Sequence, residues 1–339
     1  MCAFYHCVCD SPAPFFSSYM HFSVAGTGHL WFITASLPLW CVMYLTHCSL
    51  EPEWTREMFS MGHTRAHPEL CPARGAGVRL LVLVLSARGH AARRQAVRLT
   101  WGHAGRRRDL RLAFLVGLPA RPAPPAAAAA AAAWTTRDED ALYGDVIEAN
   151  VSDAPQHRGL RALSMLEWAL RHCALAQTLL KVDDDVFVHV VNMLRLAAAG
   201  GAGGVRGYLL RGAPAARAPG HPLYVSSAQL PGEWLPPHAL PHCYLVGAAA
   251  WRPLLRAAWT ARPVPPDQLL VTGLLAARAG LARHHEPALW PLADAANFSR
   301  ALCLAAAGLK AQLHMWERMV LEAAQTEDTH IDTYPYPYL

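Results

Sequence analysis

Residues 179–188, LLKVDDDVFV, place three consecutive aspartates between two apolar segments, in a chain that otherwise uses few acids. The first half has the pattern of a buried strand, and the apolar residues after it recur at helical spacing. In open α/β sheets, ligands bind beyond the carboxyl ends of the strands, where Asp183, Asp184 and Asp185 are expected to lie. Three adjacent carboxylates repel one another unless hydrogen bonds or a cation offset the repulsion.

Two interpretations of these acids are open on the residues alone. Mg²⁺ and Mn²⁺ take oxygen ligands and bridge carboxylates to substrate phosphates, so the acids are suited to a metal–diphosphate site. A polar turn in which one Asp caps the following helix, while the others are solvated, has the same pattern. The local sequence does not separate the two.

The composition is that of a globular protein with a large core. Hydrophobic residues make up 53% of the 339 residues and charged residues 16%, which argues against wholesale disorder. The length suits one large α/β domain or two smaller ones. The net charge is +5, but no basic run interleaves with aromatic residues, so nucleic-acid binding is not favoured. A mildly basic surface suits an anionic substrate such as a nucleotide sugar.

The first 75 residues differ from the rest. Residues 30–45 are largely apolar, yet they contain Pro38 and are shorter than the ~20 residues that usually span a bilayer. No Lys or Arg precedes them, and Arg56 is the first. We expect a signal anchor within residues 1–50, with an atypical signal or a plain buried segment as alternatives. Residues 51–75 lack periodicity and are predicted to be a stem.

Strand-like and helix-like segments alternate over residues 76–325. Residues 78–86 are a nearly continuous apolar run, which is typical of a strand buried on both faces, and residues 91–101 follow as a basic helix. This alternation predicts an α/β domain with a mostly parallel sheet and crossover helices. The alanine run at 126–133 is expected to be a loop insertion, and the tail 326–339 is expected to be disordered.

Cysteines and glycosylation sequons indicate an oxidising compartment. None of the nine cysteines forms a zinc-type pair, and the four in the globular part are spread singly, which fits structural disulfides. These four candidates are Cys71, Cys173, Cys243 and Cys303. Asn150 and Asn297 each begin an Asn-x-Ser sequon and are candidate glycosylation sites.

Four segments occur in the order of a known family's motifs. Residues 93–102, RRQAVRLTWG, are similar to R-R-x-A-[IV]-R-x-[ST]-W-G, and residues 114–117, FLVG, are similar to F-L-x-G. Residues 181–187, KVDDDVF, are similar to K-x-D-D-D-[VS]-[FY], and residues 315–316 match a C-terminal M-W. Over roughly residues 71–320, the chain thus resembles the β-1,3-glycosyltransferase family, the Golgi β-1,3-galactosyl- and N-acetylglucosaminyltransferases.

The resemblance implies a GT-A-like fold and an inverting, metal-assisted transfer. The family uses a divalent ion, usually Mn²⁺, to move galactose or N-acetylglucosamine from UDP-galactose or UDP-N-acetylglucosamine to a glycan on a glycoprotein or glycolipid. A bound cation stabilises the charge that builds on UDP as the glycosidic bond breaks. Asp183 and Asp185 would hold the metal, and Asp184 and Arg98 would lie on the donor side. The implied location is the Golgi membrane, with a lumenal catalytic domain.

The family places its general base in an acidic pair at the start of a helix. Residues 265–273, PPDQLLVTG, occupy that place and retain one acid, Asp267. In one register Asp267 matches the second acid of the pair; in the other it matches the first, and Gln268 matches the second. Capping and the helix dipole also select an Asp after two prolines, so a helix cap is the alternative to a base. We take Asp267 as the candidate base.

Departures from the family's motifs leave a second hypothesis open. Residues 153–161, DAPQHRGLR, lack the Tyr, Asn and Thr of D-x-Y-x-N-L-T-x-K, and Leu245 stands where a Gly permits close approach. The family's His before M-W falls among three alanines at 305–307, although His284 and His285 could substitute as polar contacts. The alternative to an active transferase is therefore a weakly active or inactive relative that binds nucleotide, glycan or a partner.

Overall fold

The computed structural model describes residues 54–120, 135–199, 203–218, 220–221, 223–290 and 300–325. The signal anchor expected in residues 1–50, the alanine run, Asn297 and the tail 326–339 lie outside the described residues. Among the helices of the described ranges, none is long and apolar enough to cross a membrane.

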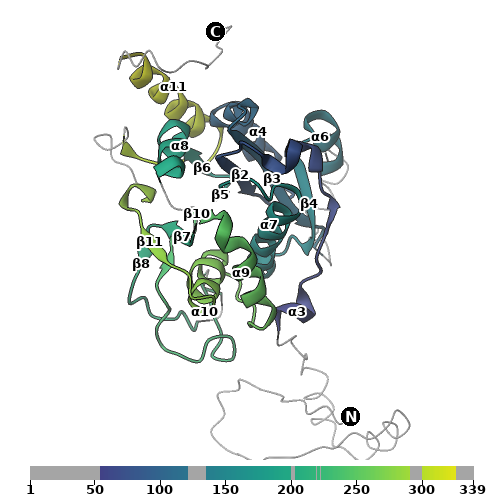
Figure 1. Ribbon diagram of the computed structural model, residues 1–339, viewed down its shortest axis with the longest axis vertical. Helices are drawn as coiled ribbons and strands as arrows, with labels where there is room; N and C mark the ends of the chain where they lie inside the picture. Colours follow the sequence, from purple (N-terminus) through teal and green to yellow (C-terminus); the bar gives the residue numbers. More distant parts are fainter. Residues whose placement is uncertain are drawn as a thin grey trace, which may run out of the picture. The chain divides into compact units, whose positions relative to one another are not determined.

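A mixed sheet of eight strands forms the centre of the domain (Figure 1). Its order is β1-β4-β3-β2-β5-β10-β7-β11. The strands are β1 (His63–Arg65), β2 (Leu80–Leu85), β3 (Leu110–Leu118), β4 (Val146–Ser152), β5 (Thr178–Asp183), β7 (Val205–Gly207), β10 (Cys243–Gly247) and β11 (Arg283–His285). The four strands from β4 to β5 run parallel, whereas β1 and β10 are antiparallel to their neighbours. The predicted α/β class with a mostly parallel sheet is confirmed.

Helices cover both faces of this sheet. Strand β2 is apolar at every position. Because successive side chains of a strand point to opposite faces, both faces of the sheet are apolar there and must be buried. Leu81, Leu83 and Leu85 join the apolar cluster under one helix layer, and Leu80, Val82 and Val84 join the cluster under the other. The first layer holds α7 (Arg158–His172), α9 (Ala248–Trp259), the π-helix η5 (Leu269–Leu275) and α10 (Ala276–Arg278). The second layer holds α4 (Ala91–Arg98), η3 (Trp101–Arg106), α8 (Val190–Ala199) and α11 (Leu309–Gln325).

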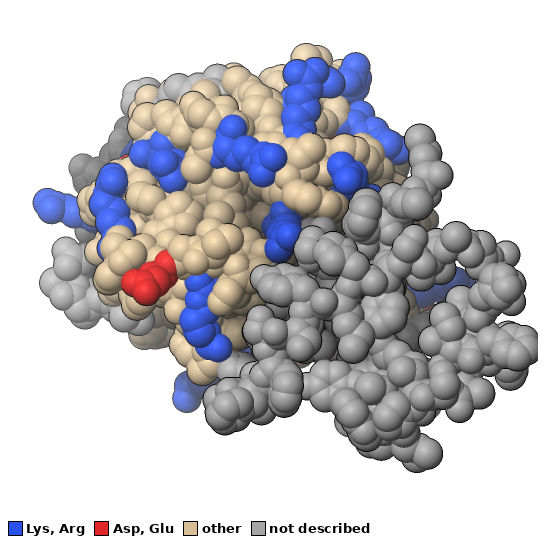
Figure 2. Space-filling view, turned by 90° about the horizontal axis from the view of Figure 1, so that it is seen from below, with Lys and Arg blue, Asp and Glu red and all other residues tan. Residues whose placement is uncertain are grey.

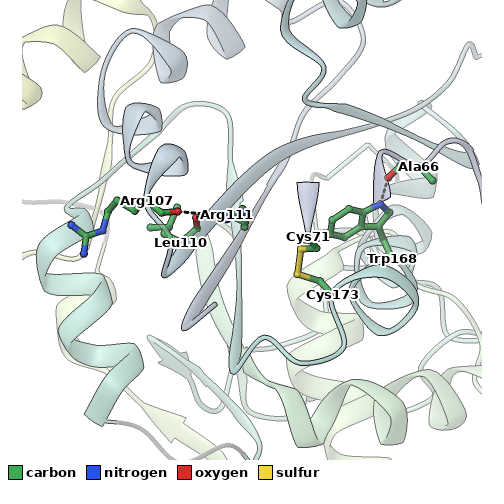
Figure 3. Close-up of a disulfide and its surroundings, with 7 residues drawn as sticks. All are labelled: Ala66, Cys71, Arg107, Leu110, Arg111, Trp168 and Cys173. Carbon is green, nitrogen blue, oxygen red and sulfur yellow. Dashed lines mark hydrogen bonds between the residues drawn. A yellow bond between two sulfur atoms is a disulfide. The ribbon is translucent and has the colours of Figure 1, made fainter. Parts of the chain in front are cut away.

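Residues 55–75 belong to the folded domain, which corrects the predicted stem. They contain α3 (Thr55–Met58), β1 and the turns η1 (Pro68–Leu70) and η2 (Pro72–Gly75), and β1 pairs with β4 in the main sheet. Cys71 is buried in a disulfide with Cys173, and the indole nitrogen of Trp168 donates to the carbonyl of Ala66 (Figure 3). The segment lacks periodicity because its elements are only three or four residues long.

Two small strand pairs and one further helix complete the domain. The strands β6 (Val186–Val188) and β12 (Cys303–Ala305) pair antiparallel, as do β8 (Leu209–Leu210) and β9 (His238–Ala239). The helix α6 (Thr136–Tyr143) contacts β4 and begins with a capping box from Thr135 and Asp138. A disulfide joins Cys243 of β10 to Cys303 of β12, so the chain near the C-terminus is tied to the middle of the main sheet.

Basic side chains dominate the face of the molecule shown in Figure 2, where acidic side chains are sparse. This agrees with the net charge of +5 and with the small share of acids in the chain. Several of the acids that the chain does have are buried, among them Asp184, Asp267 and Glu139, and therefore add little to the outer surface.

Candidate metal and transfer site

Asp183 is the last residue of β5, and Asp184 and Asp185 come directly after it. The three side chains have different surroundings. Asp184 is buried and faces the loop after β2, where it accepts hydrogen bonds from Ser86 Oγ (2.6 Å) and Arg93 Nη1 (3.2 Å). Nδ1 of His90 lies 2.8 Å from Oδ2 of Asp184, the same oxygen that accepts from Ser86. Burial opposes ionisation of Asp184, but the bonds from His90 and Ser86 and the charge of Arg93 hold its pKa below the usual value. Asp184 thus ties β5 to the start of α4.

Asp183 and Asp185 form, together with His242, a group that could hold a metal ion. One ligand atom from each of the three residues lies within 4.8 Å of the other two. Two carboxylate oxygens and an imidazole nitrogen suit Mn²⁺ and other first-row divalent ions. The side chain of Asp185 is 38% exposed, so the group is open to a ligand from solvent.

His242 reaches the acids through the antiparallel pairing of β5 and β10. Cys243 lies opposite Val182, so the residue before it lies beside Asp183, whose backbone N–H donates to the carbonyl of His242 at 3.1 Å. The sequence does not predict His242 as a candidate ligand, because the strand pairing that places it there joins residues about 60 positions apart. Nothing in the local sequence marks His242 as a ligand.

Neither residues 305–307 nor the pair His284 and His285 places a histidine next to Asp183 and Asp185. Residues 305–307 are alanines, and Ala306 contributes only a backbone N–H, which donates to the carbonyl of Asp185 at 2.8 Å. His284 and His285 lie on β11 at the edge of the sheet, where His285 Nδ1 accepts from the backbone of Leu209. Neither histidine belongs to the group around Asp183.

A buried ionic cluster adjoins the metal group on the α7 side of the sheet. Lys181 and Tyr244 are opposite one another on β5 and β10 and point to the same face. Asp267, which precedes the π-helix η5, contacts both of them, at 2.9 Å from Lys181 Nζ and 3.2 Å from Tyr244 Oη. Arg158, the first residue of α7, donates to Asp267 (2.7 Å) and to Asp183 (2.5 Å). The candidate base and a candidate metal ligand therefore share the same guanidinium.

The charges in this cluster determine its protonation. Burial alone would raise the pKa of Asp267, but Lys181 and Arg158 overcome it and lower the pKa to about 2. Burial and the negative charge of Asp267 raise the pKa of the Tyr244 hydroxyl well above its usual value. Asp267 is therefore ionised and Tyr244 is a neutral donor at neutral pH.

Asp267 has no exposed surface and lies two residues before the π-helix Leu269–Leu275. The side chain of Asp267 makes no capping bond to the helix; its oxygens go to Arg158, Lys181 and Tyr244.

Arg98 lies apart from the acids. Its guanidinium is paired with Asp145 (2.7 Å) and Glu139 (2.8 Å) and stacks on the rings of Tyr143 and Phe114. The arginine of the same helix that does reach the acids is Arg93, whose Nη1 lies 3.2 Å from both Asp184 and Asp185. The two differ because Arg93 is at the end of α4 nearest β5, whereas Arg98 is at the last turn.

The structure also shows the surroundings of Leu245, Asn150 and the four candidate disulfide cysteines. Leu245 is buried in the apolar cluster under α4 and α8, where it pairs with Leu180. Asn150 is a half-buried residue of β4, and its side-chain oxygen accepts from Thr64 Oγ1 at 2.8 Å. The four cysteines singled out above form the two disulfides, Cys71–Cys173 and Cys243–Cys303.

Residues 92–287, which hold α4, the three acids, His242 and Asp267, match the family described as Galactosyltransferase. The chain belongs to this family. It is 32% identical over 252 residues to the human UDP-GlcNAc:betaGal beta-1,3-N-acetylglucosaminyltransferase 8, with 71% of this chain and 61% of the relative covered. It is 31% identical over 252 residues to the human Beta-1,3-galactosyltransferase 4, with 63% and 64% covered. The chain thus spans about three fifths of the length of these relatives.

The comparison with solved structures finds two glycosyltransferases, both at low similarity. The WbbM bifunctional glycosyltransferase has a TM-score of 0.37 at 10% identity, with 73% of this chain and 51% of that chain covered. The galactosyltransferase LgtC, solved with donor and acceptor sugar analogues, has a TM-score of 0.29 at 12% identity, with 70% and 95% covered. The family assignment itself rests on the sequence match.

Proposed function

We propose that this protein transfers galactose or N-acetylglucosamine from a UDP-sugar to a glycan hydroxyl in β-1,3 linkage, in the Golgi lumen. The observation that carries the proposal is the placement of Asp183, Asp185 and His242 beside Asp267 at the carboxyl end of β5. The family membership and the names of the relatives, which include both sugars, support it. The two disulfides agree with an oxidising compartment.

The donor side is assigned to the metal group and to the basic residues around it. Asp183, Asp185 and His242 would hold Mn²⁺ or another divalent ion, which when bound stabilises negative charge on a departing diphosphate. Arg93, whose side chain is 37% exposed, adds a positive charge that can reach a phosphate without leaving the site. Asp184 holds Arg93 in place.

Asp267 is assigned as the general base of an inverting transfer. The acceptor hydroxyl oxygen forms a bond to C1 of the donor sugar, while the bond from C1 to the phosphate oxygen breaks and its electron pair leaves with UDP. The hydroxyl proton passes to a carboxylate oxygen of Asp267. Inversion follows because the acceptor and the leaving group lie on opposite sides of C1.

The test compares Mn²⁺-dependent UDP binding, UDP-sugar hydrolysis and transfer in the wild type, Asp185→Ala and Asp267→Ala. We expect Asp185→Ala to lose binding and turnover together, and Asp267→Ala to keep UDP binding while transfer falls on the order of 10²-fold or more. Asp109→Ala is the matched control. This aspartate is paired with Arg107 at 2.8 Å and precedes β3, at the amino ends of the parallel strands, whereas Asp183 is at a carboxyl end. Unchanged binding and turnover in Asp185→Ala would refute the metal assignment.

The second candidate function is a binding module with little turnover. It is favoured by one observation, the complete burial of Asp267 under Arg158, which leaves the acceptor no direct path to the carboxylate. Mn²⁺-dependent binding of UDP without any hydrolysis or transfer in the wild type would decide for this function.

A further inference from the structure

Arg158 is the solvent-facing partner of Asp267. The other two partners, Lys181 and Tyr244, are each 2% exposed, whereas the Arg158 side chain is 34% exposed. Asp267 has no exposed surface of its own, although the neighbouring Asp185 is open to solvent. The guanidinium therefore forms the outer cover of the candidate base.

The hydrogen bonds of the cluster show which of its two cations can move. Lys181 uses all three of its N–H donors, on Asp183 (2.7 Å), Asp267 (2.9 Å) and the carbonyl of Pro241 (2.7 Å). Arg158 has five donors and uses one on Asp267 and one on Asp183. If Arg158 leaves, both carboxylates keep a bond from Lys181. The ammonium is thus the permanent partner and the guanidinium the exchangeable one.

The backbone that carries Arg158 is fixed by the packing of the first turn of α7. The next residue, Gly159, donates its N–H to the carbonyl of Pro265 at 3.0 Å, and a Cβ at Gly159 would lie 2.4 Å from the carbonyl oxygen of Val264. The first turn of α7 is therefore packed directly on the segment that leads to Asp267. Movement of the cover is therefore confined to rotation of the Arg158 side chain.

We propose that Arg158 is a donor-controlled cover of Asp267: a nucleoside diphosphate bound at Asp183 and Asp185 draws the guanidinium away from Asp267 and opens the carboxylate to the acceptor hydroxyl. Arginine binds phosphate oxygens in pairs through its planar fork, and the diphosphate brings its charge next to Asp183, 2.5 Å from Arg158. Arg158 is thereby a positioning residue that orders the reaction, donor before acceptor. The inference rests on the proposed function, since it names how that site is controlled.

The experiment measures the exposure of Asp267 directly. A water-soluble carbodiimide with an amine at about pH 6 couples to accessible carboxyl groups, while carboxyls closed in ion pairs are protected. Trypsin does not cut before proline, so the peptide 257–278 contains Asp267 as its only carboxyl side chain, and mass spectrometry quantifies its labelling. The full chain is labelled with and without UDP and Mn²⁺, as wild type, Arg158→Leu, Arg158→Lys and Arg171→Leu.

We expect wild-type labelling of Asp267 to rise on the order of tenfold when UDP and Mn²⁺ are added. Arg158→Leu is expected to be labelled to the same high level without UDP. Arg158→Lys, which keeps the charge but not the fork, is expected to lie between the two. Arg171→Leu should behave like the wild type, because Arg171 is an exposed arginine of the same helix whose partner is Glu167, at 3.1 Å.

Two results would overturn the proposal: Asp267 that stays protected in both Arg158 variants, or wild-type labelling that does not change with bound UDP. Calorimetry of UDP binding to the wild type is run alongside. Absence of UDP binding there would refute the proposed function and the donor control with it, while labelling of the Arg158 variants without UDP still decides whether Arg158 covers Asp267.

Discussion

At the scale of single residues, Asp183 and Asp267 show how one pair of cations can serve two acids. Lys181 and Arg158 each contact both carboxylates. The two cations hold the pKa of Asp267 below its usual value, whereas burial and the charge of Asp267 raise the pKa of Asp183. Removing one partner of such a buried cluster leaves an uncompensated charge, and this costs more than the cluster contributes when complete. The stability of the domain therefore depends on each member.

Asp267→Asn is predicted to lower the free energy of unfolding by about 3–5 kcal/mol at neutral pH. The amide keeps the shape of the carboxylate but removes the ionised partner that Lys181 and Arg158 share. Urea denaturation measures the change. Asp109→Asn, whose pair with Arg107 is partly exposed, is expected to cost less than about 1 kcal/mol, and an equal loss in both variants would contradict the prediction.

The same carboxylate predicts a pH dependence. The folded-state pKa of Asp267 is about 2, below the usual value of 3.8, so its contribution is complete above about pH 4 and is lost as the pH falls through about 2. The loss is about 2 kcal/mol. Denaturation curves between about pH 5 and pH 2 should show this decline in the wild type. A decline of the same size in Asp267→Asn would assign it to other carboxyl groups.

At the scale of elements, the site depends on where three segments meet the end of β5. Strand β10 brings His242 and Tyr244 next to β5, the first turn of α7 brings Arg158, and the turn before η5 brings Asp267. The strand pair β6–β12 follows the acids, Ala306 after β12 donates its N–H to the carbonyl of Asp185, and the Cys243–Cys303 disulfide joins β12 to β10. The first turn of α7 packs on the turn before η5, where Gly159 donates its N–H to the carbonyl of Pro265 at 3.0 Å.

Gly159→Ala is predicted to destabilise the domain by about 1–3 kcal/mol and to lower transfer activity. The new Cβ would lie 2.4 Å from the carbonyl oxygen of Val264, so the turn that carries Asp267 must shift. Gly89→Ala is the control, because a Cβ there would meet no atom within 4 Å. Thermal denaturation and transfer rates together test the prediction; equal effects of the two substitutions would argue against it.

At the scale of the whole molecule, the domain begins before the apolar strand that marks it in the sequence. Strand β1 covers the edge of β4, and the Cys71–Cys173 disulfide closes a loop across 102 residues. Thr55 also donates to the carbonyl of Ala261 at 3.0 Å, so the first described turn is held by a residue more than 200 positions away. Residues 54–75 are thus part of the folded domain.

A fragment of residues 54–325 is predicted to fold, whereas a fragment of residues 76–325 is predicted to be unstable and prone to aggregate. The shorter fragment loses a disulfide worth about 2–5 kcal/mol and exposes the edge of β4. Gel filtration and thermal denaturation compare the two. Cys71→Ser in the longer fragment separates the disulfide from β1, and a shorter fragment as stable as the longer one would contradict the prediction.

Patterns that lie within one segment were predictable from the sequence. The continuous apolar run of β2, the amphipathic α7 and the acids after β5 each follow from local periodicity and residue type, and they were enough to predict the α/β class. The short β1 and the π-helix η5 were not predictable, because one is too short and the other has the wrong period for such patterns.

The α/β class, the position of Asp183, Asp184 and Asp185 at the end of a strand, and the family motifs around them follow from the amino-acid sequence. Which side chains meet those acids depends on tertiary contacts. Antiparallel pairing placed His242 beside Asp183, and packing of α7 on the turn before η5 placed Arg158 over Asp267. The physical reason is that these contacts join residues far apart in the chain, so no local pattern records them.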